Sequence, residues 1–379
     1  MRRGAKALYA FDVSTAASPT LKWRKGTAEL SGLGQTWSAP KVLNSAGYGS
    51  GVTPMIIMGG GYDVCHDIDG NTNGCGTDGK KIYLIDPSGT GSVLQTFTLP
   101  DSMVADLTIV TDNATGYVKY IYGADLGGNV YRISGGANSP IGTTAPGSWT
   151  ITKIAVLGGS GEDNRKFMFA PDVVEIDSNT YGVLLGSGDR EKPLTSYTAA
   201  VAVNNHFYMI QDKPTNATWL STEYATCDAN VICNDSLVAI ESSATPTTSD
   251  LASKKGWYLD LASAEQVVTS AITVFNTVTF STHKPAVAEA GTCGTLGVAK
   301  AYNIDYKNAA AIVGTDRGAV IAGGGLPPSP VAGKVTLDDG TTVPFIIGAN
   351  PTSAIQAGAP PAPLSAVRPR SRVYWNIKK

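Results

Sequence analysis

The sequence is poor in charged residues, in histidine and in long apolar runs. Asp, Glu, Lys and Arg together make up 16% of the 379 residues, and the formal net charge is −2. No run of Lys and Arg occurs, which argues against nucleic-acid binding, because such binding needs clustered cations to displace counterions. No apolar run is long enough to form a transmembrane helix. Only three histidines are present, and none lies in a recognisable catalytic motif.

A secretory signal peptide is also not recognisable. The basic start Met1–Gly4 runs into Ala5–Val13, which contains Asp12 and then turns polar. We therefore expect the sequence to begin at a strand inside a longer protein, with an N-terminal region absent. The length suits two average domains or one large all-β domain, and we predict a single domain over residues 1–379.

Cysteine is scarce, and its spacing is informative. Cys65 and Cys75 bracket one short polar loop, and Cys227 and Cys233 bracket another, with spacings that fit no standard zinc motif. We predict two local disulfides and hence an oxidising compartment. Cys293 is left over, either as a half-buried free thiol or as the partner of a cysteine in absent sequence.

Glycine, with 43 residues, is abundant, and the turns it favours separate recurrent strands. In YIYGADLGGNVYRI, Tyr120 and Tyr122 alternate with Ile121 as in a strand, and Asp125–Asn129 is typical of a turn, which predicts a β-hairpin. The first half of this pattern recurs as LYAFD, IYLID and AYNID. Looser copies are Phe207-Tyr208 before Asp212 and Trp257-Tyr258 before Asp260. The spacing between copies is irregular, with some near 40–50 residues and two gaps nearly double that, and strand-built repeats of about 40–50 residues are typical of propeller blades. The alternative is that Tyr and Asp are merely common at strand ends.

The predicted strands group into four blades of four strands, so we predict an all-β fold, a β-propeller of four-stranded blades. The blades fall within residues 37–99, 104–157, 169–240 and 257–304, and the fourth is predicted to open with Trp257–Leu261. Arg372–Ile377 is predicted to be a terminal strand.

Ten stretches, taken in order along the chain, carry a resemblance to one family. They are RRGAKALYAFDVS, MGGGYDVC, KKIYLIDPSGTG, VADLTIV, YIYGADLGGNVYRI, RKFMFAPDVV, GVLLGSGDREKPL, NHFYMIQD, KGWYLDL and RVYWNIKK. The chain resembles the C-terminal β-propeller of the PilY1/PilC family of type IV pilus tip-associated and biogenesis proteins. The resemblance implies a propeller of about five to seven blades, incomplete here, and a location at the pilus tip, at the outer membrane, in the periplasm or outside the cell.

The resemblance also implies a non-enzymatic factor that regulates pilus assembly and retraction and contributes to adhesion. Its partners would be minor pilins at the pilus tip and a host or abiotic surface. One alternative is a quinoprotein-like (PQQ-type) dehydrogenase, whose quinone-binding carboxylates and vicinal cysteines are not visible in this sequence. The other is a carbohydrate-binding propeller. No cofactor is required, and calcium is the candidate ion.

Family members often carry a calcium loop, D-x-D-x-D-G-x-x-D, before the ADLGG hairpin. The matching stretch has Thr111, Asn113, Thr115 and Lys119 at the acidic positions and keeps the turn glycine, Gly116. Calcium needs about six to eight oxygen ligands, largely from carboxylates. We therefore predict that the turn is retained and that calcium binding is lost there.

The cysteine-closed loop is the better calcium candidate. Asp67, Asp69, Asn71 and Asn73 place oxygens at alternate positions, which converge if the loop curls. The glycine usual at the sixth position of such a loop is absent. The alternative is a solvated, Asx-rich loop closed by the disulfide.

The segment GSGDRE invites a catalytic interpretation with Ser187 as nucleophile, but a serine nucleophile needs a base that is held by a third group. We predict a structural turn instead. Its glycines shape the strand end, and its charged residues form charge-assisted hydrogen bonds with neighbouring loops. The turn residues are Gly186, Gly188, Asp189, Arg190 and Glu191.

Overall fold

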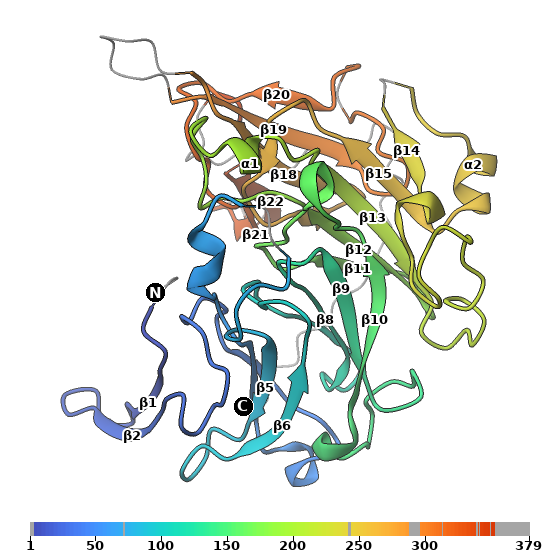
Figure 1. The fold of residues 1–379 in the computed structure, drawn as a ribbon. Helices are drawn as coiled ribbons and strands as arrows, with labels where there is room; N and C mark the ends of the chain where they lie inside the picture. The colour runs from blue at the N-terminus through green and yellow to red at the C-terminus, as the bar shows by residue number, and fades with distance from the viewer. Residues whose placement is uncertain are drawn as a thin grey trace.

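A computed structural model describes residues 4–70, 73–241, 244–287, 296–312, 314–338, 340, 342–348 and 350–352. Cys293, Asn71 and the predicted terminal strand Arg372–Ile377 lie outside the described residues. The described chain is mostly strand and turn, and six sheets follow one another along it (Figure 1).

The sheets are built mainly from strands that are adjacent in sequence and antiparallel. The first three contain β1 (Leu8–Asp12) and β2 (Thr20–Lys25); β3 (Lys41–Leu43), β4 (Met55–Gly59), β5 (Lys81–Ile85) and β6 (Val93–Thr98); and β7 (Thr108–Thr111), β8 (Val118–Ala124), β9 (Asn129–Ser134) and β10 (Thr150–Val156). The last three contain β11 (Asp172–Asp177), β12 (Thr180–Gly186), β13 (His206–Asp212), β14 (Val238–Ile240) and β15 (Gly256–Asp260); β16 (Gln266–Val267), β17 (Ile272–Val274), β18 (Thr277–Lys284), β19 (Val298–Asp305) and β20 (Gly318–Val320); and β21 (Val331–Thr336) and β22 (Thr342–Ile347). The short helices are α1 (Thr198–Val201) and α2 (Thr248–Ser253).

Strand β8 is buried on both faces, which reveals how the sheets pack. Ile121 belongs to an apolar cluster shared with the sheet β3–β6, where Ile57 and Leu84 lie. Tyr120 and Tyr122 point to the opposite face and belong to a cluster shared with the sheet β11–β15. The period-two alternation of this strand therefore places it between two neighbouring sheets. The predicted hairpin is confirmed, because β8 pairs antiparallel with β9.

The next pair of sheets packs in the same way. Val183 and Leu185 of β12 face the cluster shared with β8, whereas Leu184 faces a cluster shared with β18 and β19. In that cluster the rings of Phe207 and Phe280 are stacked with their centroids 3.8 Å apart. Consecutive sheets thus pack face to face, as the blades of a propeller do, and the predicted all-β, propeller-like fold is confirmed.

We name the four larger sheets blade 1 (β3–β6), blade 2 (β7–β10), blade 3 (β11–β15) and blade 4 (β16–β20). Blades 1 and 2 each contain the four strands predicted from the sequence. Strand β15, predicted to open the fourth blade, instead pairs with β13 and lies in blade 3. Strand β14 then pairs with β15 in parallel, as a fifth strand. The prediction was wrong because the connection 213–255 returns the chain to the edge of β13 before the next sheet begins.

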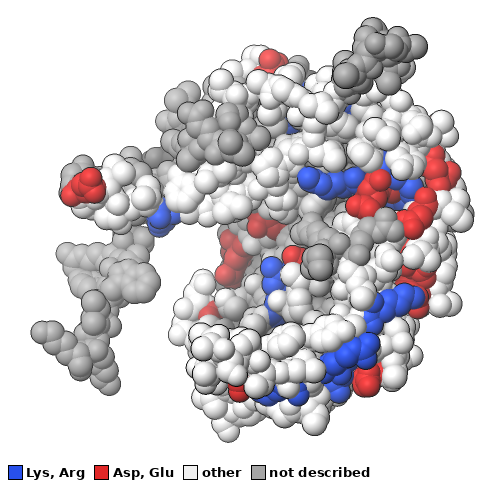
Figure 2. Space-filling model, turned by 90° about the vertical axis from the view of Figure 1, so that its left-hand side faces the viewer, with Lys and Arg blue, Asp and Glu red and all other residues white. Residues whose placement is uncertain are grey.

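Charge is sparse on the face seen in Figure 2, where uncharged side chains cover most of the surface and Lys and Arg lie close to Asp and Glu. Within the described ranges, no helix combines the length and the apolar character needed to span a membrane.

Candidate functional site

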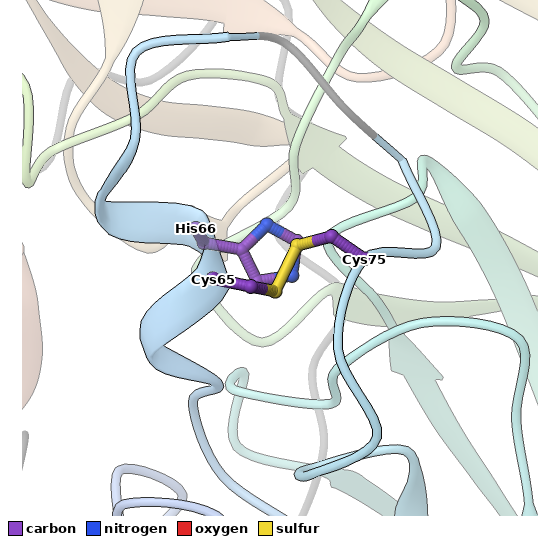
Figure 3. Close-up of side chains that lie close together, drawn as sticks. All are labelled: Cys65, His66 and Cys75. Carbon is purple, nitrogen blue, oxygen red and sulfur yellow. A yellow bond between two sulfur atoms is a disulfide. The ribbon is translucent and has the colours of Figure 1, made fainter.

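The cysteine-closed loop connects β4 and β5 in blade 1 and contains the 3-10 helix η2 (Val64–Asp67). A disulfide joins Cys65 and Cys75, as the spacing predicts (Figure 3). The second predicted disulfide, Cys227–Cys233, is also present and lies in the connection 213–255 of blade 3. Both disulfides therefore lie in connections between strands, and none of the four cysteines belongs to a strand.

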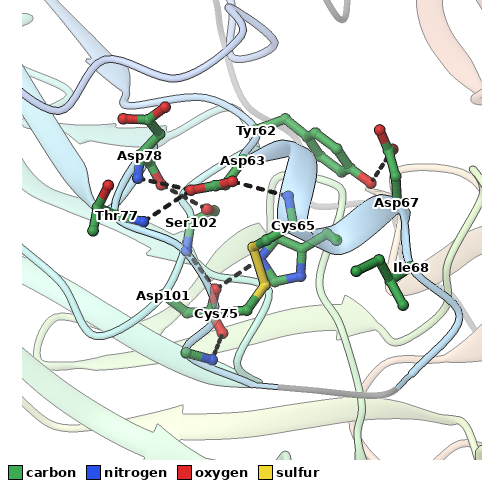
Figure 4. Close-up of a disulfide and its surroundings, with 12 residues drawn as sticks. Tyr62, Asp63, Cys65, Asp67, Ile68, Cys75, Thr77, Asp78, Asp101 and Ser102 are labelled. Atoms are coloured by element: carbon green, nitrogen blue, oxygen red, sulfur yellow. Dashed lines mark hydrogen bonds and ion pairs between the residues drawn. A yellow bond between two sulfur atoms is a disulfide. The ribbon is translucent and has the colours of Figure 1, made fainter.

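Asp63 fastens the two ends of the cysteine-closed loop. Its Oδ1 accepts a hydrogen bond from the backbone N–H of Cys65 at 2.9 Å, and its Oδ2 accepts bonds from Thr77 and Asp78 at 2.9 and 2.8 Å (Figure 4). Burial raises the pKa of Asp63, but these backbone N–H groups and the nearby His66 lower it more, so the pKa lies below its ordinary value. The ionised carboxylate is thus the form that holds the loop.

A second carboxylate, Asp101, holds the same loop from the connection between β6 and β7. Its Oδ1 lies 3.0 Å from His66 Nε2, and its Oδ2 accepts a hydrogen bond from Gly74 N at 2.6 Å (Figure 4). The side chains of His66 and Asp101 are only 1% and 2% exposed. Burial raises the pKa of Asp101, but the hydrogen bonds from His66, Gly74 and Ser102 lower it by more. The pKa therefore lies below its ordinary value.

The predicted calcium ligands of this loop contact three separate parts of the chain. Asp67 Oδ1 accepts a hydrogen bond from the hydroxyl of Tyr62 at 3.1 Å. The carboxylate of Asp69 accepts bonds from the backbone N–H groups of Ala199 and Ala200 in α1, each at 3.0 Å. Asn73 Nδ2 donates to Gly159 O. Calcium binding by this loop stays a prediction.

Cys65, His66 and Cys75 lie together in Figure 3, with their possible metal-binding atoms within 4.8 Å of one another. The two sulfurs are bonded to each other, and His66 is engaged by Asp101. A thiolate is the form of cysteine that binds a metal, so in this oxidised state the group acts as a structural clasp.

The turn that resembles a calcium loop is organised by one aspartate. Asp112 Oδ1 accepts hydrogen bonds from the backbone N–H of Ala114 and from both the N–H and the hydroxyl of Thr115. Gly116 follows with a φ of +74°, which favours glycine. Lys119 forms a salt bridge with Glu175 at 3.1 Å. The contacts describe a turn of the Asx type, and the loss of calcium binding at Thr111, Asn113, Thr115 and Lys119 stays a prediction.

The GSGDRE turn lies at the end of β12 and is closely packed. A Cβ at Gly186 would collide with the side chain of Val267, and a Cβ at Gly188 would collide with the Val267 carbonyl. Asp189 forms salt bridges with Lys166 at 2.8 Å and with Lys192 at 3.4 Å. Burial raises the pKa of Asp189, but the two ammonium groups lower it more, so the pKa lies below its ordinary value.

The other charged residues of this turn bond to neighbouring backbone. Arg190 Nη1 donates to Val268 O and, at 3.1 Å, to Pro327 O. The backbone N–H of Glu191 donates to Asp189 Oδ1 at 3.2 Å. Ser187 is fully buried; its hydroxyl donates to Asn205 Oδ1 and accepts a bond from the backbone N–H of His206, both at 3.0 Å. These contacts describe a packed turn.

Sequence reasoning missed the residues that join this turn to the cysteine-closed loop. Lys192 Nζ donates hydrogen bonds to His66 O at 2.6 Å and to Ile68 O at 3.3 Å. Lys192 directly follows the GSGDRE motif, and that position is the signal that could have drawn attention to it. The same ammonium binds Asp189, so the turn in blade 3 and the loop in blade 1 share one cation.

Comparisons with known proteins place the fold. No protein-family model matches the chain, and no curated protein matches its sequence. Among solved structures, the crystal structure of the Pseudomonas aeruginosa PilY1 C-terminal domain matches with a TM-score of 0.59 and 17% identity, over 92% of this chain and 79% of that one.

Two further structures match more weakly. Saccharomyces cerevisiae Sqt1 has a TM-score of 0.46 and 10% identity over 92% of this chain and 65% of its own, and a europium-containing methanol dehydrogenase has 0.34 and 11% over 74% and 47%. Both scores are too low to establish a shared fold. The chain thus has a fold like that of the PilY1 C-terminal domain, which confirms the resemblance inferred from its motifs.

Proposed function

We propose that this chain is a propeller module of a type IV pilus-associated protein and that it acts, without catalysis, in pilus assembly and retraction and in surface contact. The observation that carries the proposal is the likeness in fold to the PilY1 C-terminal domain over 92% of the chain. The two disulfides agree with a periplasmic or extracellular location. The buried, hydrogen-bonded state of Ser187 supports a non-catalytic role for the GSGDRE turn.

In this proposal the blades are a rigid support, and the long connections present side chains to partners. Asp63, Asp101 and Lys192 hold described residues on both sides of the cysteine-closed loop, which preorganises those parts of it. A preorganised loop loses little conformational entropy when it binds. Minor pilins at the pilus tip and a host or abiotic surface are the partners that fit this role.

The test is a deletion of residues 4–352 from the native protein in its own cells, followed by counting of surface pili. We expect few surface pili where retraction is active and restored pili in a retraction-deficient background. Normal pilus numbers and normal attachment after the deletion would contradict the proposal. Purified protein mixed with pyrroloquinoline quinone should gain no dehydrogenase activity; such activity would support the quinoprotein alternative instead.

A further inference from the structure

A surface pocket of about 640 Å³ lies beside the end of β13, and most of its lining residues stand outside the motifs considered above. Its walls come from the end of β13 and from the connection 213–255, which carries the Cys227–Cys233 disulfide and contains helix α2. The volume falls in the range that is usual for ligand sites in proteins. The pocket therefore has the size and the position of a binding site in a connection that departs from the regular meander.

The aromatic wall of this pocket is fixed in place. Trp219 Nε1 donates a hydrogen bond to Gln211 O at 2.9 Å, which ties the indole to the end of β13. The buried Lys255 ammonium donates to Trp219 O, to Thr222 O and to the carboxylate of Glu223. The charge of Glu223 is thereby balanced by Lys255. The Lys255 ammonium is thus engaged in holding the connection 213–255. The pocket is a preformed structure, which reduces the entropy lost on binding.

Two other lysines line the pocket, and neither forms a salt bridge among the described residues, although Asp177 is near enough to Lys213 to interact with its charge. Lys213 Nζ lies 4.3 Å from the centroid of the Trp219 ring and forms no hydrogen bond or salt bridge with the described chain. Lys254 Nζ lies 4.0 Å from the centroid of the Tyr224 ring and donates to the backbone carbonyl of Asp235 at 2.6 Å. Two ammonium groups, each beside an aromatic ring, therefore line the pocket together.

We propose that this pocket binds an acidic sugar residue, such as a hexuronate, of a surface polysaccharide. Its carboxylate would pair with the ammonium groups of Lys213 and Lys254, which lie over the rings of Trp219 and Tyr224 in the pocket. The pocket wall also carries hydroxyl groups and the side-chain amide of Gln211, which can form hydrogen bonds with the sugar hydroxyls. The proposal gives a ligand class to the surface contact in the proposed function, and its biological meaning rests on that function.

The experiment is calorimetric titration of the purified chain with trigalacturonate and, in parallel, with neutral galactotriose. We expect saturable binding of trigalacturonate that weakens with added salt and binding of the neutral trisaccharide that is at least about tenfold weaker. Lys213→Met should weaken trigalacturonate binding about tenfold, because it removes one charge-assisted contact. The matched control is Lys307→Met, since Lys307 Nζ also lies over a ring, that of Tyr306 at 5.7 Å, but outside this pocket.

Several results would overturn the proposal: equal affinities for the acidic and neutral trisaccharides, an unchanged affinity in Lys213→Met, or equal binding of a glutamate tripeptide. Circular dichroism of both variants establishes that each is folded before titration. Because binding is measured without cells, it is separate from the pilus test. If the purified chain binds trigalacturonate but the deletion leaves pilus numbers normal, only the pilus role is contradicted. If the purified chain does not bind trigalacturonate but the deletion removes surface pili, only the pocket proposal is contradicted.

Discussion

The ion pair between Arg132 and Asp212 links blade 2 to blade 3, and we predict that Asp212→Asn strongly destabilises the fold. Arg132 lies on β9 and Asp212 ends β13. Arg132 Nη1 donates to both carboxylate oxygens, at 2.5 and 2.6 Å, and the hydroxyl of Tyr122 donates to Oδ2 at 2.8 Å. The side chains of the pair are 1% and 0% exposed.

The substitution keeps the shape of the side chain and removes the charge that compensates Arg132. Breaking a buried pair by removal of one partner typically costs about 3–5 kcal/mol of unfolding free energy. Arg132 keeps a hydrogen bond from Nη2 to Asn138 Oδ1 at 2.7 Å, and its guanidinium lies 5.9 Å from the centroid of the Tyr120 ring. These remaining contacts favour the lower end of the range, so we expect a loss of about 3 kcal/mol.

Urea denaturation followed by tryptophan fluorescence measures this loss. The matched control is Glu175→Gln, which removes the partner of Lys119 from a pair whose side chains are 34% and 23% exposed; such pairs contribute at most about 1 kcal/mol. The double variant Arg132→Met/Asp212→Leu should recover much of the stability, because no buried charge is left uncompensated. If Asp212→Asn loses no more stability than Glu175→Gln, the reasoning is refuted.

Three smaller changes test the loop and the turn by urea denaturation. Cys65→Ser/Cys75→Ser should lose roughly 2–3 kcal/mol, because the disulfide closes a separation of 10 residues; an equal midpoint in wild type and variant would refute this. Gly188→Ala should lose about 1–3 kcal/mol, whereas Gly147→Ala, with no neighbour within 4 Å of a Cβ, should be neutral. Folding lowers the pKa of Asp63, so its stabilising effect is present above the unfolded value of 3.8 and lost as the pH falls through the folded pKa. Asp63→Asn should therefore destabilise at neutral pH, with the difference from wild type shrinking in acid.

The parts of the fold that the sequence predicted correctly are those with local pairing. The hairpin of β8 and β9 is closed by the turn Asp125–Asn129, so the strand alternation and the turn residues are enough to define it. Strand β15 was assigned to the wrong blade, because its partner β13 precedes it by the whole connection 213–255. No local pattern records which of two neighbouring sheets a strand joins after so long a connection.

In the candidate site, too, the local contacts could be predicted from the sequence and the contacts between distant residues could not. Cysteine spacing predicted both disulfides, because each closes a short loop. The contact from Lys192 to His66 O joins residues 126 positions apart, and neither residue lies in a pattern that indicates the other. Asp69 bonds to the first turn of α1 in the same non-local way. The alternating positions of Asp67 and Asp69 predict a shared calcium ion, and the structure adds that each carboxylate has a different protein partner; calcium binding stays a prediction.

Both disulfides lie in connections, whereas the apolar clusters that stabilise the fold lie between the blades. The blades are stabilised by apolar clusters between neighbouring sheets, so their motifs are constrained by packing and carry the resemblance in sequence. The cysteine-closed loop and the connection 213–255 are each held by a disulfide together with a buried charge that bonds to backbone: Asp63 in the first, Lys255 in the second. A connection held in this way is free to change its exposed side chains without weakening the blades. For this reason Lys213, Lys254 and the aromatic rings of the pocket stand outside the motifs that identified the fold. Differences in ligand between propellers of this kind are expected to lie in such connections.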